Sequence, residues 1–154
     1  MLQTNTIAPE FNLPNQLGEI ISLSQFKGNK NVVLYFYPKD DTSGCTLEAQ
    51  QFTALIEKFS NKETVVIGVS KDDCESHLNF IDKYQLKVEL ISDTSGELCE
   101  KYAVWQEKEK NGVKKMGIVR STFIIDKQGI LVDVEYSVVA DGHAQVVLDK
   151  VSKI

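Results

Sequence analysis

The sequence has few of the residues and patterns that mark several protein classes. Its 154 residues include 3 cysteines and 2 histidines, and no apolar run approaches the ~18 residues of a membrane span. Three irregularly spaced cysteines argue against a disulfide-stapled secreted scaffold. The net charge of -5 and the pI near 5.1 argue against nucleic-acid binding. Because no basic segment followed by an apolar one opens the chain, we expect a cytoplasmic protein.

The composition that remains is that of one globular domain. Hydrophobic residues make up 42% and charged residues 25% of the chain, and this length can bury one hydrophobic core. No repeat, linker or low-complexity segment divides it. We therefore expect a single domain over residues 1–154.

Apolar runs alternate with helically spaced stretches along the chain. A hairpin is predicted within residues 11–26, with its turn at Gly18. The predicted strands cover 31–37, 64–70, 88–93, 117–126 and 129–137, and the predicted helices 46–59, 74–86, 96–104 and 143–154. The apolar residues of the early strands are continuous, which is typical of strands covered on both faces. This order predicts a three-layer α/β domain.

Two other segments have simpler interpretations. The charged stretch 107–115 is interpreted as an exposed loop, although the loop at 106–115 could instead mediate a contact. Tyr35, Phe36 and Tyr37 are assigned to the core, and side chains at the end of their strand could line a pocket.

Cys45 is the main candidate for chemistry, because it lies where a predicted strand leads into a helix. A thiol reacts as its thiolate, and its usual pKa of about 8.5 leaves it mostly protonated at neutral pH. The first turn of a helix offers free N–H donors and a partial positive charge that favour an anion. Thr42 and Ser43 are suitable capping residues, and Pro38 stops the strand and could shield one side of a pocket.

The spacing of Pro38, Thr42 and Cys45 is the PxxxTxxC pattern, and it resembles that of the peroxiredoxins. The segment FYPKDDTSGCTLEAQQF is similar to the bacterioferritin comigratory protein or peroxiredoxin Q branch. The segments APEFNL, VVIGVSKD, LISD, KYAVW and GIVRSTFIIDKQG resemble that branch in the same order. The resemblance covers almost the whole chain and implies a thioredoxin-like fold with a central mixed sheet.

The resemblance also assigns roles to individual residues. Cys45 takes the place of the peroxidatic cysteine and Thr42 that of the threonine that hydrogen-bonds the thiolate and peroxide. Pro38 matches the shielding proline, Arg120 the arginine that stabilises the thiolate, and Glu48 an acidic position expected to orient Arg120. Such a peroxidase reduces hydrogen peroxide and organic hydroperoxides, cycles through a sulfenic acid and needs neither metal nor organic cofactor.

The cysteine that usually resolves the sulfenic acid is absent from this chain. Members of the branch carry it at the position of Gln50 or near that of Ile81. Cys74 and Cys99 remain as possible resolving residues. A one-cysteine cycle with thioredoxin, glutaredoxin or glutathione as the reductant is favoured over resolution by either of these cysteines. Ser43 replaces the proline usual in the branch, and the branch suggests a monomer.

Other functions fit the residues less well. A dithiol oxidoreductase needs a cysteine at the position of Thr42. A cysteine hydrolase needs a histidine base, and both His77 and His143 are expected to be solvated. Cys74 and His77 are two isolated candidate ligands with no second pair nearby in the sequence, and two ligands are too few for a structural metal site. A non-catalytic interaction protein that keeps the fold stays an alternative.

Overall fold

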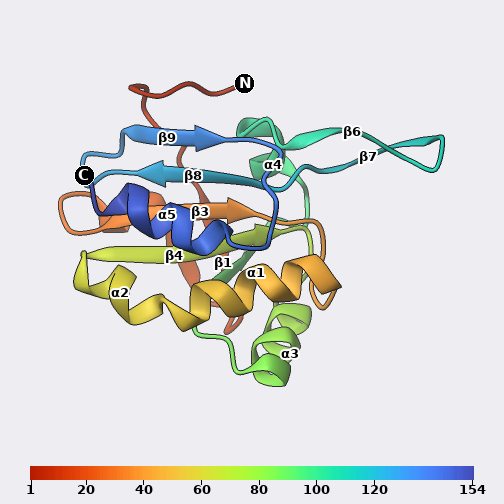
Figure 1. Cartoon of the computed structure of the whole chain (residues 1–154), viewed down its shortest axis with the longest axis horizontal. Helices are drawn as coiled ribbons and strands as arrows, with labels where there is room; N and C mark the ends of the chain where they lie inside the picture. The colour runs from red at the N-terminus through yellow and green to blue at the C-terminus, as the bar shows by residue number, and fades with distance from the viewer.

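A mixed five-stranded sheet forms the middle layer of the molecule in the computed structural model, which describes Met1–Ile154. The strand order is β5-β4-β3-β8-β9 (Figure 1). The strands are β3 Asn31–Phe36, β4 Thr64–Ser70, β5 Glu89–Ser92, β8 Ser121–Ile125 and β9 Leu131–Glu135. β3, β4 and β5 are parallel, whereas β8 and β9 join as antiparallel neighbours. The predicted three-layer α/β fold is thus confirmed.

Helices cover both faces of this sheet. One face carries α1 Ser43–Ala54, α2 Ile56–Asn61, α3 Cys74–Tyr84 and α5 His143–Val151, and the other carries η1 Leu23–Phe26 and α4 Glu97–Lys101. Alternate residues of β3 point to opposite faces, so Tyr35 and Tyr37 pack under α1 while Phe36 packs on the α4 side. Burial on both faces explains the continuous apolar run of this strand.

The N-terminal hairpin has the predicted form. β1 Asn12–Pro14 pairs antiparallel with β2 Ile20–Ser22, and Gly18 has a φ of 77° in the connecting turn. Glycine adopts this left-handed conformation without steric cost. The hairpin lies beside β5, since Asn15 forms a bridge with Ile91.

The predicted helix 46–59 is wrong in its bounds. Helix α1 begins earlier, at Ser43, and the chain leaves helical geometry at Leu55, where φ is -104° and ψ is 5°. This break lets both Phe52 and Phe59 become fully buried, with their ring centroids 5.9 Å apart. Apolar spacing reports which face is buried but not a bend within it.

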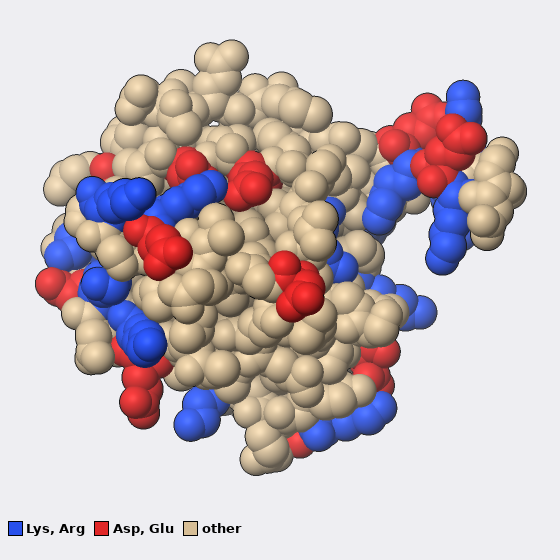
Figure 2. Space-filling view, viewed as in Figure 1, with Lys and Arg blue, Asp and Glu red and all other residues tan.

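The charged segment predicted as a loop is an exposed two-stranded ribbon. β6 Trp105–Lys110 pairs with β7 Val113–Ile118, and the ribbon projects from the body (Figures 1 and 2). Asn111 and Gly112 have φ values of 54° and 78° in the turn. Asn-Gly is a strong signal for a tight hairpin, so the sequence contained this ribbon's turn. The prediction of exposure was correct and that of a loop was wrong.

The predicted strand 117–126 is divided between two sheets. β7 ends at Ile118 and β8 begins at Ser121, so Val119 and Arg120 lie between the ribbon and the central sheet. The N–H of Val119 donates to the carbonyl of Val104, and the Ser121 hydroxyl donates to the carbonyl of Val119. This interruption frees Arg120 from either strand and lets its side chain reach α1.

None of the helices combines the length and apolarity that crossing a bilayer requires.

Candidate functional site

Cys45 lies in the first turn of α1, which follows the carboxyl end of β3. Its predicted position at a helix start is confirmed. The residue is 2% exposed, and it packs in the cluster that includes Tyr35 and Ala49. In an open α/β sheet this edge is where ligands bind. The thiol is therefore both buried and placed near the positive end of a helix.

Arg120 links Cys45 to a buried acid. Its Nη2 donates to the Cys45 sulfur at 3.3 Å, and its Nη1 donates to Glu48 Oε1 at 2.7 Å. The Arg120 side chain is 15% exposed and that of Glu48 is fully buried. A guanidinium has several fixed donors, so one side chain can hold a thiolate and a carboxylate together. The sequence could not place Arg120, 75 residues from Cys45, without the family resemblance.

Burial and the charges of neighbouring groups shift the pKa values of Glu48 and Arg120 in opposite directions. Burial raises the pKa of Glu48 from 4.5 to about 7, and the charge and hydrogen bond of Arg120 only partly offset it. Burial alone would lower the pKa of Arg120, but Glu48 and Cys45 outweigh it and the pKa rises. Arg120 is therefore a permanent cation, whereas Glu48 can change its charge near neutral pH.

Two buried oxygen atoms beside the thiol have no hydrogen-bond partner. These are Oε2 of Glu48 and the hydroxyl of Tyr35. Burial, followed by the charges of Glu48 and Cys45, raises the pKa of Tyr35 well above its usual value. Tyr35 therefore stays neutral, and the sequence interpretation of it as a core residue is confirmed.

Pro38 and Thr42 flank the loop that leads into α1. Thr42 is the N-cap residue, but its side chain makes no capping hydrogen bond. Its hydroxyl donates to the carbonyl of Lys39 at 2.8 Å, which closes the loop upon itself. Pro38 is half-buried directly after Tyr37, where the strand ends. Both residues therefore shape the entry to the helix.

Gly44 is a site residue that the sequence interpretation missed. A Cβ at this position would lie 3.1 Å from Arg120 Nη2 and 3.9 Å from Arg120 Cζ. That is tighter than ordinary van der Waals contact, so the glycine leaves room for the guanidinium against the helix. Its position directly before Cys45 was the only available signal.

The two other cysteines differ in accessibility. Cys74 is half-buried at the first residue of α3, after the strand β4 that runs parallel to β3. Cys99 is fully buried in α4. Burial, followed by hydrogen bonding to Asp93, raises the pKa of Cys99 far above that of an ordinary thiol. Cys99 is thus a poor nucleophile, whereas Cys74 is on the same edge of the sheet as Cys45.

The expectation that both histidines are solvated was wrong. His77 is 0% and His143 is 5% exposed. His77 contacts Asp40 and the carbonyl of Ile91, and His143 contacts the hydroxyl of Thr122. Polar neighbours in the sequence hid this, because each histidine lies on the inner side of its helix. Each has its partners elsewhere than at Cys45, which gives no support to a cysteine hydrolase. No three His, Cys, Asp or Glu side chains meet as a potential metal site.

Comparison with known proteins identifies the family of the chain. Residues 4–134 match the AhpC/TSA family. The chain is 46% identical to a putative peroxiredoxin bcp of Helicobacter pylori over 96% of this chain and 97% of that protein. It is 46% identical to peroxiredoxin Bcp of Bacillus subtilis over 81% of this chain and 79% of that protein. It is 36% identical to peroxiredoxin Bcp of Escherichia coli over 96% of this chain and 94% of that protein.

The similar solved structures belong to the same group of peroxiredoxins. A peroxiredoxin Q variant from Xylella fastidiosa superposes with a TM-score of 0.93 at 32% identity, covering 99% of this chain and 97% of that one. The bacterioferritin comigratory protein of Xanthomonas campestris, described with alkyl peroxide reduction activity, superposes with a TM-score of 0.88 at 35% identity. The match covers 93% of this chain and 90% of that one. The thioredoxin-like fold is confirmed. The chain belongs to the AhpC/TSA family and is a thiol-dependent peroxidase, a peroxiredoxin of the Bcp and peroxiredoxin Q type.

Proposed function

We propose that Cys45 is the peroxidatic residue with which the chain reduces hydrogen peroxide and organic hydroperoxides. The observation that carries this proposal is the hydrogen bond from Arg120 to the Cys45 sulfur in the first turn of α1. The guanidinium and the helix terminus both place positive charge beside the sulfur, where negative charge is needed for nucleophilic attack. Lys71 acts on Cys99 as well, but burial and Asp93 outweigh it and the pKa of that thiol is raised.

The chemistry is a displacement on oxygen. The Cys45 thiolate attacks the hydroxyl oxygen of ROOH, the sulfur–oxygen bond of the sulfenic acid forms, and the O–O bond breaks. The electron pair of that bond leaves with RO⁻, which takes a proton and departs as an alcohol or as water. Arg120 stabilises both the thiolate and the charge that develops on the leaving oxygen. Glu48 orients Arg120, Pro38 shields the sulfur, and Thr42 holds the helix entry beside it.

The sulfenic acid must then be reduced by a thiol. In a one-cysteine cycle an external thiol attacks the sulfur, water leaves, and a second thiol releases Cys45 from the mixed disulfide. Glutathione, glutaredoxin or thioredoxin would supply these thiols. Cys74 is the alternative resolving residue because it is half-buried at the same edge of the sheet. The burial and raised pKa of Cys99 argue against it.

The remaining assignments follow from this role. An enzyme that removes hydroperoxides serves antioxidant defence, and a cytoplasmic location supplies the reduced thiols it needs. The chemistry uses only side chains of this chain and the two substrates. We propose a monomer as the active unit, as the resemblance to the peroxiredoxin Q branch suggests, and one chain has a mass of 17.3 kDa.

The experiment is intact-protein mass spectrometry with peptide mapping, after one equivalent of hydrogen peroxide on the reduced protein. Gain of one oxygen at Cys45 supports a one-cysteine cycle. Loss of two hydrogens, mapped to a disulfide of Cys45 with Cys74, supports the alternative resolution. Cys45→Ser should lose peroxidase activity with each reductant.

Single Cys74→Ser and Cys99→Ser variants separate the two schemes. Under a one-cysteine cycle both turn over like the wild type with glutathione. No mass change in the wild-type protein would refute the assignment of Cys45 and favour a non-catalytic role.

A further inference from the structure

A buried polar cluster lies beside the Cys45 site and takes no part in the chemistry above. Asp40 belongs to the loop before α1, and its Oδ2 lies 2.8 Å from His77 Nδ1 on α3. The side chains are 4% and 0% exposed. The Ser76 hydroxyl also donates to Oδ2 at 2.8 Å, and the Tyr37 hydroxyl donates to Oδ1 at 2.5 Å. The carboxylate of Asp40 is thus surrounded by donors from two elements.

The hydrogen bonds of His77 define where its protons are. Its Nε2 lies 3.0 Å from the carbonyl oxygen of Ile91, which can only accept, so Nε2 carries a hydrogen. Its Nδ1 faces a carboxylate oxygen, so one further proton lies between His77 and Asp40. Burial and the charge of Asp40 raise the pKa of Tyr37, which keeps its phenol as a donor. Removing either partner leaves a buried polar group without compensation.

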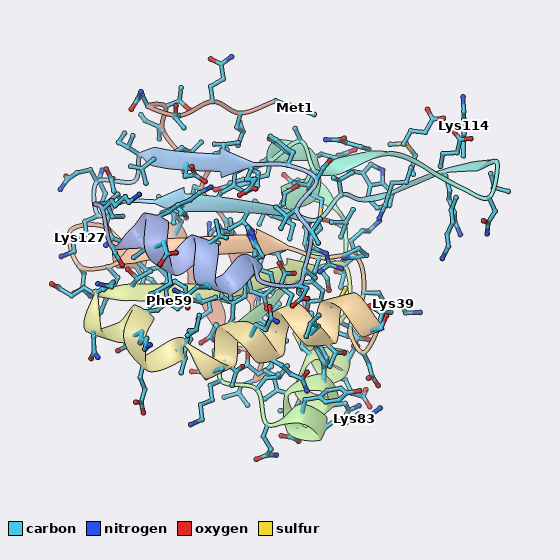
Figure 3. The ribbon with its side chains drawn as sticks, viewed as in Figure 1. Met1, Lys39, Phe59, Lys83, Lys114 and Lys127 are labelled. Carbon is cyan, nitrogen blue, oxygen red and sulfur yellow. The ribbon has the colours of Figure 1, made fainter.

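This pair ties the loop to the rigid part of the molecule. The N–H of Asp40 also donates to Asp72, in the loop after β4. The next residue, Asp41, has a φ of 58°, a left-handed conformation that is uncommon for residues with a Cβ and that aspartate tolerates better than most. On its far side Asp41 accepts from Lys83 and Tyr84, and these contacts are exposed. Lys39 and Lys83 lie at the same end of the molecule (Figure 3).

Strained loops persist only where the surrounding structure holds them. Asp40 is buried on one side of Asp41, and Thr42 starts the helix on the other. The loop therefore sets the position of the first turn that contains Cys45. A thiol must reach the oxidised sulfur, yet Cys45 is only 2% exposed. That turn must open during the cycle, and the loop opposes the opening.

We propose that the Asp40–His77 pair is a positioning element that holds the first turn of α1 closed over Cys45. It keeps the thiolate on Arg120 during attack on peroxide and limits access of the reductant to the sulfenic acid. The two half-reactions then depend on the pair in opposite directions. This inference rests on the proposed role of Cys45.

The test measures both half-reactions in the full chain. Quench-flow with mass spectrometry gives the rate of oxygen gain from hydrogen peroxide and the rate of sulfenic acid loss to dithiothreitol. In Asp40→Ala and His77→Ala we expect oxidation to slow about 100-fold, since small misplacements have such effects. Reduction should accelerate about tenfold, with amide exchange at residues 42–46 faster by a similar factor. Asp40→Asn keeps the shape, can accept from Tyr37 and donate to His77 Nδ1, and loses only the acceptor for the Ser76 hydroxyl, so it should restore most of both rates.

The control is Tyr102→Phe, which removes a part-buried hydrogen bond of 2.6 Å to the Pro9 carbonyl, on the face of the sheet opposite to Cys45. It should lower stability without changing the ratio of the two rates. If Asp40→Ala does not fold, His77→Gln, which keeps an amide donor, carries the same expectations. Two rates that stay unchanged, or that fall together as stability falls, would overturn the proposal. Wild-type oxidation at Cys45 in the same assay separates this failure from a wrong assignment of the thiol.

Discussion

At the residue scale the site depends on the placement of one guanidinium. Arg120 donates to Cys45 and to Glu48 with different nitrogen atoms, so a shift of its plane lengthens both contacts. Gly44 gives it room from the helix side, where a Cβ would approach to 3.1 Å. Packing around the arginine therefore controls the thiolate as directly as the charge does.

Gly44→Ala should slow oxidation of Cys45 by about tenfold or more, because the new Cβ displaces a preorganised donor. The melting temperature should not fall, since alanine favours a helix by ~1 kcal/mol over glycine. Oxygen gain by mass spectrometry and thermal unfolding measure the two effects. Gly117→Ala is the matched control, because its Cβ would also lie 3.1 Å from a side-chain atom, the flexible Cδ of Lys108. Equal oxidation rates in the two variants would contradict the prediction.

Glu48 should make stability depend on pH. Its pKa is raised by burial from 4.5 to about 7 in the folded chain, so the folded state holds this proton more tightly than the unfolded state. The resulting stabilisation is complete below 4.5 and is lost as the pH rises through about 7. From pH 5 to 8 the wild type should lose on the order of 2 kcal/mol of unfolding free energy relative to Glu48→Gln. Urea titrations at both pH values measure this difference, and a constant difference would refute it.

At the element scale the ribbon β6–β7 stands out because it projects from the body of the molecule (Figure 1). Most of its side chains are exposed, and its strands pair only with each other. Lys108 and Lys115 are direct cross-strand neighbours, which is unfavourable for like charges. The base of the ribbon is fixed, however, because Val119 donates to Val104. The outer part of the ribbon therefore adds little to the stability of the domain.

Deleting residues 108, 109, 114 and 115 should leave the fold intact. The deletion removes two complete cross-strand pairs and keeps the Asn-Gly turn and the facing of the remaining residues. We expect the unfolding free energy to change by less than about 0.5 kcal/mol, as for other surface changes, and Cys45 oxidation to stay at the wild-type rate. Chemical denaturation and quench-flow check both. A large loss of stability would mean that the ribbon's outer half packs on the body.

At the scale of the whole molecule two apolar clusters share one sheet. Val32, Leu34 and Phe36 belong to one cluster, and Val33 and Tyr35 belong to the other. Because alternate residues of the same strand serve both, neither cluster can open without disturbing β3. The chain should therefore behave as one cooperative unit, in agreement with the expected single domain.

Urea unfolding should then show coincident transitions with two probes. The single Trp105, at the base of the ribbon under Lys71, reports on the α4 side by fluorescence. Far-UV circular dichroism reports on all helices. Superimposable curves indicate two-state unfolding, whereas separate midpoints would divide the chain into two units.

Local patterns in the sequence predicted most of the fold. The continuous apolar run of β3 and the helical spacing of apolar residues predicted the layers. A strand buried on both faces is apolar throughout, and a helix buried on one face has apolar residues at a regular spacing. The Asn-Gly pair at residues 111 and 112 is a hairpin signal that the sequence analysis overlooked, because the charges around it led to the interpretation as a loop. Cys45 could be singled out for its position between a strand and a helix.

Only the tertiary structure decided which distant groups meet this thiol. Arg120 reaches Cys45 because the chain leaves one sheet and enters another at that residue, and no local period encodes such a crossing. Glu48 has a raised pKa because of burial, which the sequence does not reveal for a carboxylate. His77 was expected to be solvated and instead forms a buried pair with Asp40. The sequence by itself determined the elements and the thiol, whereas long-range packing determined the charges that surround it.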